Sequence, residues 1–267
     1  MIARRPRIDF GDALPHWAPN IEFVQSLNAG STSLPHLEPY LNKVVDLAAA
    51  KLQDRPELLR DIAWFKAQEG NHYRQHRLFN KVLAARYPRL KVLEAKLSAD
   101  FERFLKTRSL RYNLAYSEGF EATGIVYAEF FFEQIDDLLA GADPRLVQLW
   151  KWHLAEEVEH RCVCHDVYAA LYGGYFYRLY GFFAAFFHIG GYVKAVTEYL
   201  LETDRADMSP ADRKASRKAL AAYRWRFMRF AFPRLARVLS PFYDPRKLKE
   251  PKDIAPFLAE FDRRAAT

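Results

Sequence analysis

The stretch "WHLAEEVEHRCVCHDVY", residues 152–168, contains two adjacent glutamates, a third glutamate two positions later and three histidines. Apolar residues recur through it at spacings of three and four, the pattern of an amphipathic helix with one buried face. Read at that spacing, His153, Glu157 and His160 fall on the same face as the apolar Trp150. The stretch therefore predicts a helix that carries titratable side chains into the protein core.

Residues 56–86 repeat this arrangement. A glutamate and two histidines interrupt their apolar row, which reads Phe65, Glu69, His72, His76, Phe79. Two further predicted helices each carry one glutamate within the apolar row, Glu38 and Glu121. Four long helices thus follow the order Glu, Glu-x-x-His, Glu, Glu-x-x-His, with a shorter helix between the second and the third.

This order predicts a dinuclear metal site. Residues three apart project from the same helical face, so each Glu-x-x-His pair can hold one ion. Four ionised glutamates in one core would repel and desolvate each other at a cost far above the roughly 5–15 kcal/mol that stabilises a domain, and two divalent cations would neutralise them. Helix bundles use this combination of donors for di-iron and di-manganese sites. The expected ligands are Glu38, Glu69, His72, Glu121, Glu157 and His160.

Neighbouring glutamates leave alternatives for two of these ligands. Glu156 precedes Glu157 and would replace it if the helix were rotated. Glu118 is the corresponding alternative to Glu121. Glu159 lies off the apolar row and is expected to face solvent.

The other titratable residues near these motifs have more than one open role. His76 and His153 continue the apolar rows beyond the ligands, and each is an extra ligand, a hydrogen-bonding group behind a ligand or a buried core histidine. Asp166 lies one position off the row and is expected to support a ligand from behind or to cap a helix. Cys162 and Cys164 are expected to pack in the core, because two cysteines alone are a weak signal for zinc or redox chemistry.

Apolar spacing, capping residues and prolines predict an all-α fold, a four-helix bundle with additional C-terminal helices. Asp143-Pro144 and Ser209-Pro210 each combine an N-cap with a proline at the first helical position. We expect helices over about 35–52, 56–86, 88–106, 110–139, 144–173, 175–201 and 210–240, the last broken at Pro233. The chain is predicted to form one domain, 1–267, with a metal-binding core at about 34–172 and an aromatic and basic extension at about 175–264.

The net charge of +7 is concentrated near the end of the chain. Residues 211–249 contain twelve Lys or Arg and two Asp, so this segment is expected to meet an anionic membrane surface or an acidic carrier protein. No recognised nucleic-acid motif accompanies these charges, and no nucleic-acid partner is expected. The first residues lack the apolar run of an export signal, which predicts a cytoplasmic protein, either free or peripheral to the inner face of the membrane.

The segment LYGFFAAFFHIGGYV, residues 179–193, carries no formal charge. It is shorter than the roughly 20 apolar residues of a transmembrane helix. We expect a helix that is buried or lies at an interface. Alternatively, its small and aromatic side chains line a tunnel for an alkyl or acyl chain.

Four stretches resemble the ferritin-like family of predicted metal-dependent hydrolases: LPHLEPYL (34–41), WFKAQEGNHYRQH (64–76), LAYSEGFEA (114–122) and LWKWHLAEEVEHRCVCHDVY (149–168). The resemblance covers about residues 34–172 and implies a ferritin-like bundle with the same six ligands. Two positions depart from the family pattern. Cys164 and His165 replace small or apolar residues, and Ala122 stands where a histidine often follows the lone glutamate. Neither departure removes an expected ligand.

The donor set also predicts the chemistry. Carboxylates with only two imidazoles favour iron or manganese over a structural zinc site. Our leading hypothesis is a di-iron oxidase or oxygenase that activates O2 and oxidises a hydrophobic, acyl or lipid-like substrate, with Glu69 and Glu157 as the catalytic, bridging carboxylates.

The expected cofactor is two iron ions, with manganese or zinc as alternatives. An external electron donor such as a ferredoxin is expected, because the sequence contains no nucleotide or haem motif. Two other functions stay open: a dinuclear metal-dependent hydrolase, which the family resemblance implies, and a ferroxidase-like metal-binding protein.

Overall fold

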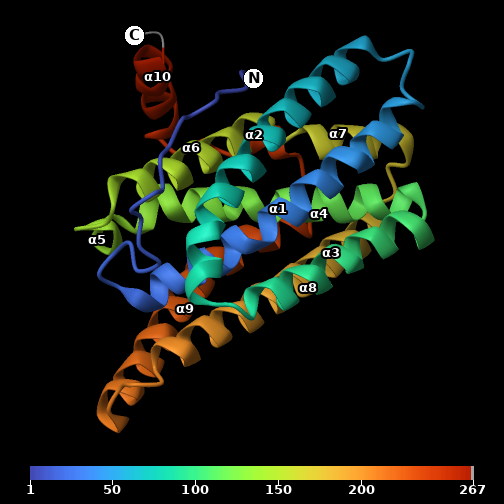
Figure 1. Cartoon of the computed structure of the whole chain (residues 1–267). Coiled ribbons are helices and arrows are strands. Elements are labelled where there is room, and N and C mark those ends of the chain that lie inside the picture. Colours follow the sequence, from blue (N-terminus) through green and yellow to red (C-terminus); the bar gives the residue numbers. More distant parts are fainter. Residues whose placement is uncertain (266–267) are drawn as a thin grey trace.

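The structure is a computed structural model that describes residues 1–265. Helices and short turns account for the regular structure of these residues, and no strand occurs among them (Figure 1). The fold is the predicted one, an all-α four-helix bundle with additional C-terminal helices. Residues 266 and 267 of the predicted domain lie outside the described residues.

Four long helices form the bundle. Helix α1 contacts α2 and α4, and α6 contacts both α4 and α2, so the four helices enclose one core. They are α1 (Ile21–Ala49), α2 (Pro56–Arg86), α4 (Leu110–Gln134) and α6 (Pro144–His160).

The remaining helices pack around the outside of the bundle. Helix α3 lies against α1, α8 lies along α4 and α1, α9 crosses α4, and α10 contacts α6 (Figure 1). Their bounds are α3 (Leu90–Thr107), α5 (Asp136–Leu139), α7 (Val163–Leu171), α8 (Tyr175–Asp204), α9 (Pro210–Val238), the 3-10 turn η1 (Pro245–Lys247) and α10 (Ile254–Ala265).

Two helix starts follow the capping signals of the sequence. Asp143 accepts a hydrogen bond from the Arg145 backbone N–H (2.9 Å), and Ser209 accepts one from Asp212 (3.2 Å). Each cap satisfies an N–H group that has no partner inside its helix. The predicted starts at Pro144 and Pro210 are therefore confirmed.

The predicted start of the first helix at Pro35 is wrong. Helix α1 begins fourteen residues earlier, after the N-cap Asn20, and Pro35 lies inside it. A proline leaves the carbonyl four residues before it without its helical donor. Here the Ser31 carbonyl accepts a hydrogen bond from Asn80 Nδ2 on α2 (2.9 Å). This neighbouring side chain compensates for the lost donor, so the helix can run through Pro35.

Two long predicted helices are interrupted. The 110–139 helix ends at Gln134 and is followed by the short α5, and the 144–173 helix breaks after His160. At this second break Arg161 donates side-chain hydrogen bonds to the carbonyls of Val158 and Pro245. The bond to Val158 satisfies a carbonyl that would accept a backbone hydrogen bond in a continuous helix.

The predicted break at Pro233 is also wrong, because α9 continues through it to Val238. The helix is held on α4 on both sides of the proline. Phe230 contacts the Phe130 ring, and Val238 packs with Ala122. Tertiary packing therefore overrides the local preference of proline.

Helices α4 and α8 approach each other very closely. A Cβ atom on Gly181 would lie 2.3 Å from the backbone C and O atoms of Ala115, and one on Gly119 would lie 2.4 Å from the Phe182 Cα atom. Only glycine permits backbones to come this close. This contact fixes which face of α8 is turned toward the bundle and which face is turned outward.

Replacing Gly181 by alanine should therefore lower the free energy of unfolding by about 1–3 kcal/mol, because the new methyl group meets backbone atoms that cannot move independently. Gly190→Ala is the matched control on the same helix. A Cβ atom at Gly190 meets nothing within 4 Å, so better helix propensity should raise the stability by about 0.5–1 kcal/mol. Urea unfolding of both variants measures the difference. Equal effects of the two substitutions would contradict the close α4–α8 contact.

Candidate metal centre

Seven titratable side chains from the four bundle helices meet in the core, and each is at most 3% exposed. The structure brings all six predicted ligands together and adds His153 to them. The seven are Glu38 on α1, Glu69 and His72 on α2, Glu121 on α4, and His153, Glu157 and His160 on α6.

The first cluster surrounds His160. Its Nε2 atom lies 3.3 Å from Glu69 Oε1, 3.4 Å from Glu121 Oε2 and 3.5 Å from Glu157 Oε2. Donor atoms that bind one ion at about 2.1 Å lie about 3 Å or slightly more from each other. Three oxygens and one imidazole nitrogen are therefore arranged as the ligands of a single metal ion would be.

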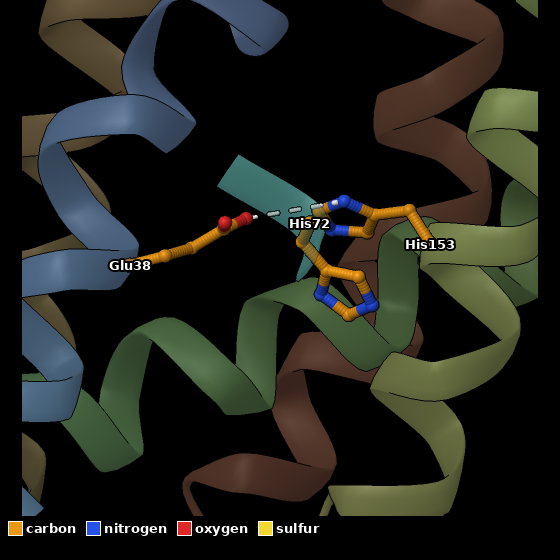
Figure 2. Close-up of side chains that lie close together, drawn as sticks. All are labelled: Glu38, His72 and His153. Carbon is orange, nitrogen blue, oxygen red and sulfur yellow. Dashed lines mark ion pairs between the residues drawn. The ribbon is translucent and has the colours of Figure 1, made fainter. Parts of the chain in front are cut away.

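The second cluster consists of Glu38, His72 and His153, whose side chains point toward one another from three different helices (Figure 2). Glu38 Oε1 lies 3.9 Å from His153 Nδ1, the ion pair marked in Figure 2. The two imidazole rings stack with their centroids 4.3 Å apart. One carboxylate and two imidazoles provide the donors for a second metal position.

Glu69 and Glu157 lie between the two clusters. Glu157 Oε1 is 3.1 Å from His153 Nε2, while its Oε2 is 3.5 Å from His160 Nε2. Glu69 Oε2 is 3.9 Å from His72 Nδ1, while its Oε1 faces His160 at 3.3 Å. Each carboxylate thus offers one oxygen to either cluster, as the predicted bridging role requires.

Several donor atoms of these residues are buried without a hydrogen-bond partner among the described residues. Both carboxylate oxygens of Glu38, Glu69 and Glu121 are in this state, together with His72 Nδ1 and His160 Nε2. A buried polar atom left unsatisfied costs about 1–3 kcal/mol, and more when it is charged. Metal ions would supply the missing partners, so the residues present fit a dinuclear centre.

Burial and neighbouring charges shift the pKa values of the site carboxyls in opposite directions. Burial raises the pKa of Glu69 and of Glu121 to about 8 and raises the pKa of Glu38 well above its usual range. Glu157 is equally buried, but His160 and His153 together hold its pKa well below the usual range, and Glu157 in turn raises the pKa of His160. Divalent cations would therefore displace protons when they bind.

Hydrogen bonds from outside the clusters orient the imidazoles. His72 Nε2 lies 2.9 Å from Glu156 Oε2, which turns Nδ1 toward the second cluster. Glu156 Oε1 in turn accepts hydrogen bonds from the backbone N–H and the guanidinium of Arg4, each at 3.1 Å. Such partners determine which ring nitrogen is available to a metal and raise its basicity.

The other two histidines are held in the same way. His160 Nδ1 lies 3.0 Å from Gln68 Oε1, and Gln68 donates to Glu159 (2.8 Å). His153 Nδ1 lies 3.0 Å from His76 Nε2. His76 is therefore a hydrogen-bonding group behind a ligand, and burial keeps its pKa well below the usual range.

Most of the open alternatives in the sequence are decided by the helix rotations. Glu157 faces the clusters and Glu156 does not replace it. Glu118 is turned away from the centre, where it pairs with His165 (3.2 Å) and Arg178 (3.4 Å).

Two expectations about acidic residues are wrong. Glu159 does not face solvent freely, because Arg4 pulls it inward with an ion pair of 2.8 Å. Asp166 neither supports a ligand nor caps a helix: it lies in the first turn of α7, after the N-cap Cys162, and pairs with Arg246 at 2.6 Å. In both cases an arginine distant in sequence determines where the carboxylate points.

Arg4 and Gln68 are site residues that the sequence reasoning missed. Arg4 lies 152 positions before Glu156, and nothing in its local sequence distinguishes it from the neighbouring arginines. Gln68 had a weak signal, since it directly precedes a predicted ligand. The alternating burial of residues 4, 6, 8 and 10 indicates an extended segment that lies along the bundle.

A family model for predicted metal-dependent hydrolases matches residues 2–249. The chain belongs to this family. The match extends beyond the bundle motifs to Arg4 at one end and through α8 and α9 at the other. Comparison with curated proteins and with solved structures returns no match. Membership assigns a metal-dependent enzyme, and the two buried Glu/His clusters could hold its metal ions.

Arg4→Gln should weaken metal binding by about 10–100-fold, the usual cost of removing a group that supports a metal ligand. The substitution removes the guanidinium from Glu156, Glu159 and Asp262. Competition with a metal chelator measures the affinity. Arg5→Gln is the control, because Arg5 is the exposed neighbour in the same segment. Equal metal affinities of the two variants would contradict the supporting role of Arg4.

The metal-free protein should lose stability as the pH rises from about 6.5 to 8. The pKa values of Glu69 and Glu121 (about 8) and of His160 (above 6.5) are higher in the folded protein than in the unfolded chain, so folding binds protons in this range. The free energy of unfolding then falls with rising pH.

Metal ions displace these protons, so the metal-loaded protein should lack this dependence. Urea unfolding at several pH values, with a chelator or with excess Mn²⁺, measures both curves. A flat curve in the presence of the chelator would show that the buried carboxyls are not protonated as described.

Proposed function

We propose that this chain is a hydrolase that works at a dinuclear metal centre between α1, α2, α4 and α6. The observation that carries the proposal is the division of the seven buried donors into two clusters that share Glu69 and Glu157. Membership of the predicted metal-dependent hydrolases supports hydrolysis as the reaction. Two metal ions about 3.5–4 Å apart would lower the pKa of a water molecule and polarise the bond to be cleaved.

The residues of the chain would divide the work as follows. Glu69 and Glu157 would bridge the ions, and Glu38 and Glu121 would each complete one of the two ligand sets. His153 would bind through Nε2, which faces Glu157, while its Nδ1 stays hydrogen-bonded to His76.

His76 Nδ1 in turn lies 2.8 Å from the Ser31 hydroxyl, so a continuous hydrogen-bonded path leads from the centre to α1. Burial lowers the pKa of both His76 and His153, which keeps the two rings neutral near pH 7. Neutral rings in this path can accept and pass a proton.

A second candidate function is O2 activation by two iron ions, with oxidation of a hydrophobic, acyl or lipid-like substrate. Four carboxylates and three imidazoles suit iron or manganese better than zinc. The ligands are also almost completely buried, an environment that a small molecule such as O2 enters more readily than a bulky ester. This reaction needs an external electron donor such as a ferredoxin.

Metal loading separates these functions. The metal-free protein would be loaded with zinc, manganese or ferrous iron and tested with chromogenic acyl and phosphate esters, and O2 consumption by the ferrous form would be followed in parallel. Ester cleavage by the zinc or manganese form, with two metals per chain, is expected for the hydrolase. Rapid O2 consumption with inactive zinc and manganese forms would overturn hydrolysis in favour of oxidation. Oxidation of excess Fe²⁺ without any organic substrate would indicate a ferroxidase.

Glu121→Gln should reduce the metal content below two ions per chain, because it removes an oxygen donor of the first cluster. Glu118→Gln is the matched control, one turn earlier on α4 and equally buried, but turned toward Arg178. Elemental analysis after gel filtration measures the stoichiometry. Loss of metal from both variants, or from neither, would contradict the assignment of Glu121.

A further inference from the structure

Large apolar side chains are unusually exposed along α8. Phe176, Tyr180, Phe183 and Phe187 follow one another at spacings of four, three and four residues, so they lie on a single face of the helix. Phe176 is 84% exposed and Phe187 is 69% exposed. The residues of 179–193 therefore divide between a face packed on α4 and a face open to solvent, which argues against an enclosed tunnel.

Helix α9 has a corresponding stripe. Trp225, Met228, Phe232 and Leu239 are exposed at helical spacing, and Phe242 follows the end of the helix. Trp225, Phe232 and Phe242 are 70%, 71% and 83% exposed. We call the exposed stripes of α8 and α9, together with Phe242, the aromatic face.

Helices α8 and α9 meet where α8 begins and α9 ends. The Tyr175 hydroxyl donates a hydrogen bond to the Leu239 carbonyl (2.6 Å), and Arg178 donates one to the Val238 carbonyl (2.7 Å). Phe182 and Val238 also share one apolar cluster with Ala122 of α4. The first turns of α8 thus border the end of α9, and both helices pack on α4, so their exposed side chains face away from it.

An apolar surface of this kind marks a site of interaction. By length and composition α8 is the one helix among the described residues that could cross a membrane, and 22% of its most apolar window is buried. Its inner side packs along α4 and α1, and its second half carries Glu198 and Glu202. The helix therefore offers one face to an apolar phase, as an interfacial helix does, without spanning it.

The charges around the aromatic face are positive. Residues 213–243 contain nine Lys or Arg and no Asp or Glu. Four of these arginines form ion pairs within the protein: Arg224 pairs with Glu198 (3.8 Å), Arg226 pairs with Asp137 (2.8 Å), and Arg234 and Arg237 pair with Glu129 (2.8 and 3.1 Å). The expectation that the whole basic segment is free for a partner is therefore too broad.

Three cations near the aromatic face remain available. Arg229 stands between Trp225 and Phe232 in sequence, is exposed, and has no carboxylate partner among the described residues. Lys247 and Lys249, which follow Phe242 in sequence, are also exposed and have no carboxylate partner among the described residues. Cations beside exposed aromatic rings suit anionic headgroups above an acyl layer.

We propose that the aromatic face docks on a bilayer that contains anionic lipid, with its aromatic side chains at the acyl boundary and Arg229, Lys247 and Lys249 among the headgroups. An acidic carrier protein would satisfy the cations but offers no acyl layer for the five aromatic side chains that are more than two-thirds exposed. A second copy of the chain would bring the same cations face to face across a two-fold interface. The docking surface does not depend on which reaction the metal centre performs, so its failure would leave the proposed function intact.

Vesicle flotation of the full-length, metal-loaded protein tests the proposal. Vesicles of phosphatidylcholine alone would be compared with vesicles that contain about one-third phosphatidylglycerol. The protein is expected to float with the anionic vesicles and to be released by high salt, which screens the headgroup attraction. Failure to float with the anionic vesicles would overturn the proposal.

Two pairs of variants test the residues. Trp225→Ser with Phe232→Ser should abolish flotation, whereas Trp64→Ser, which removes an exposed aromatic side chain from α2, should not. Arg229→Gln should weaken binding about fivefold, the effect of one cation near an anionic surface, and Lys81→Gln on α2 should have no effect. Unchanged metal content and helical circular dichroism would show that the variants are folded.

Two outcomes would contradict the assignment. Flotation of the Trp225/Phe232 variant at the wild-type level would show that another surface binds lipid. A dimeric wild type that ignores vesicles, together with a monomeric Trp225/Phe232 variant in light scattering, would assign the aromatic face to a second copy of the chain.

Discussion

Four glutamates share one buried core, and this electrostatic constraint organises the molecule. Their carboxylates converge from four helices into an environment where like charges repel strongly and water cannot screen them. His160, whose pKa is raised by Glu157, offsets part of the charge, yet six carboxylate oxygens remain without hydrogen-bond partners among the described residues. The helices of the bundle can pack in this way when cations, or protons in their absence, neutralise the core. Metal binding and folding are therefore linked in this protein.

The same constraint extends outward through the groups that orient the imidazoles. His72 is held by Glu156 and His160 by Gln68, and these two lines of hydrogen bonds converge on Arg4, directly and through Glu159. Arg4 also pairs with Asp262 of α10. The N-terminal segment and α10 thus both contact the hydrogen-bonded groups that orient the metal ligands. The geometry of the centre depends on contacts that a bundle of four helices alone would lack.

The C-terminal helices α8 and α9 pack on the bundle through specific contacts and also present an exposed aromatic surface. Some of their arginines form ion pairs with acidic residues on and beside α4 and hold α9 in place. The close backbone contact at Gly119 and Gly181 holds one face of α8 against α4. The opposite face of α8, with its aromatic side chains, is therefore exposed. Helix α4 carries Glu121 and also packs against both α8 and α9, so it contacts the metal centre and the helices of the aromatic face.

The sequence by itself determined the all-helical class, the order of the ligand-bearing helices and the six residues expected to hold metal, because helical periodicity is a local property that spacing reveals. Only the tertiary structure decided that Glu157 and not Glu156 faces the centre, that His153 joins the donors and that Glu159 turns inward. It also decided the start of α1, where Asn80 of another helix compensates for Pro35. These features depend on how each helix is rotated about its axis and on partners up to 155 positions away, as with Arg4 and Glu159, and neither is encoded in local spacing.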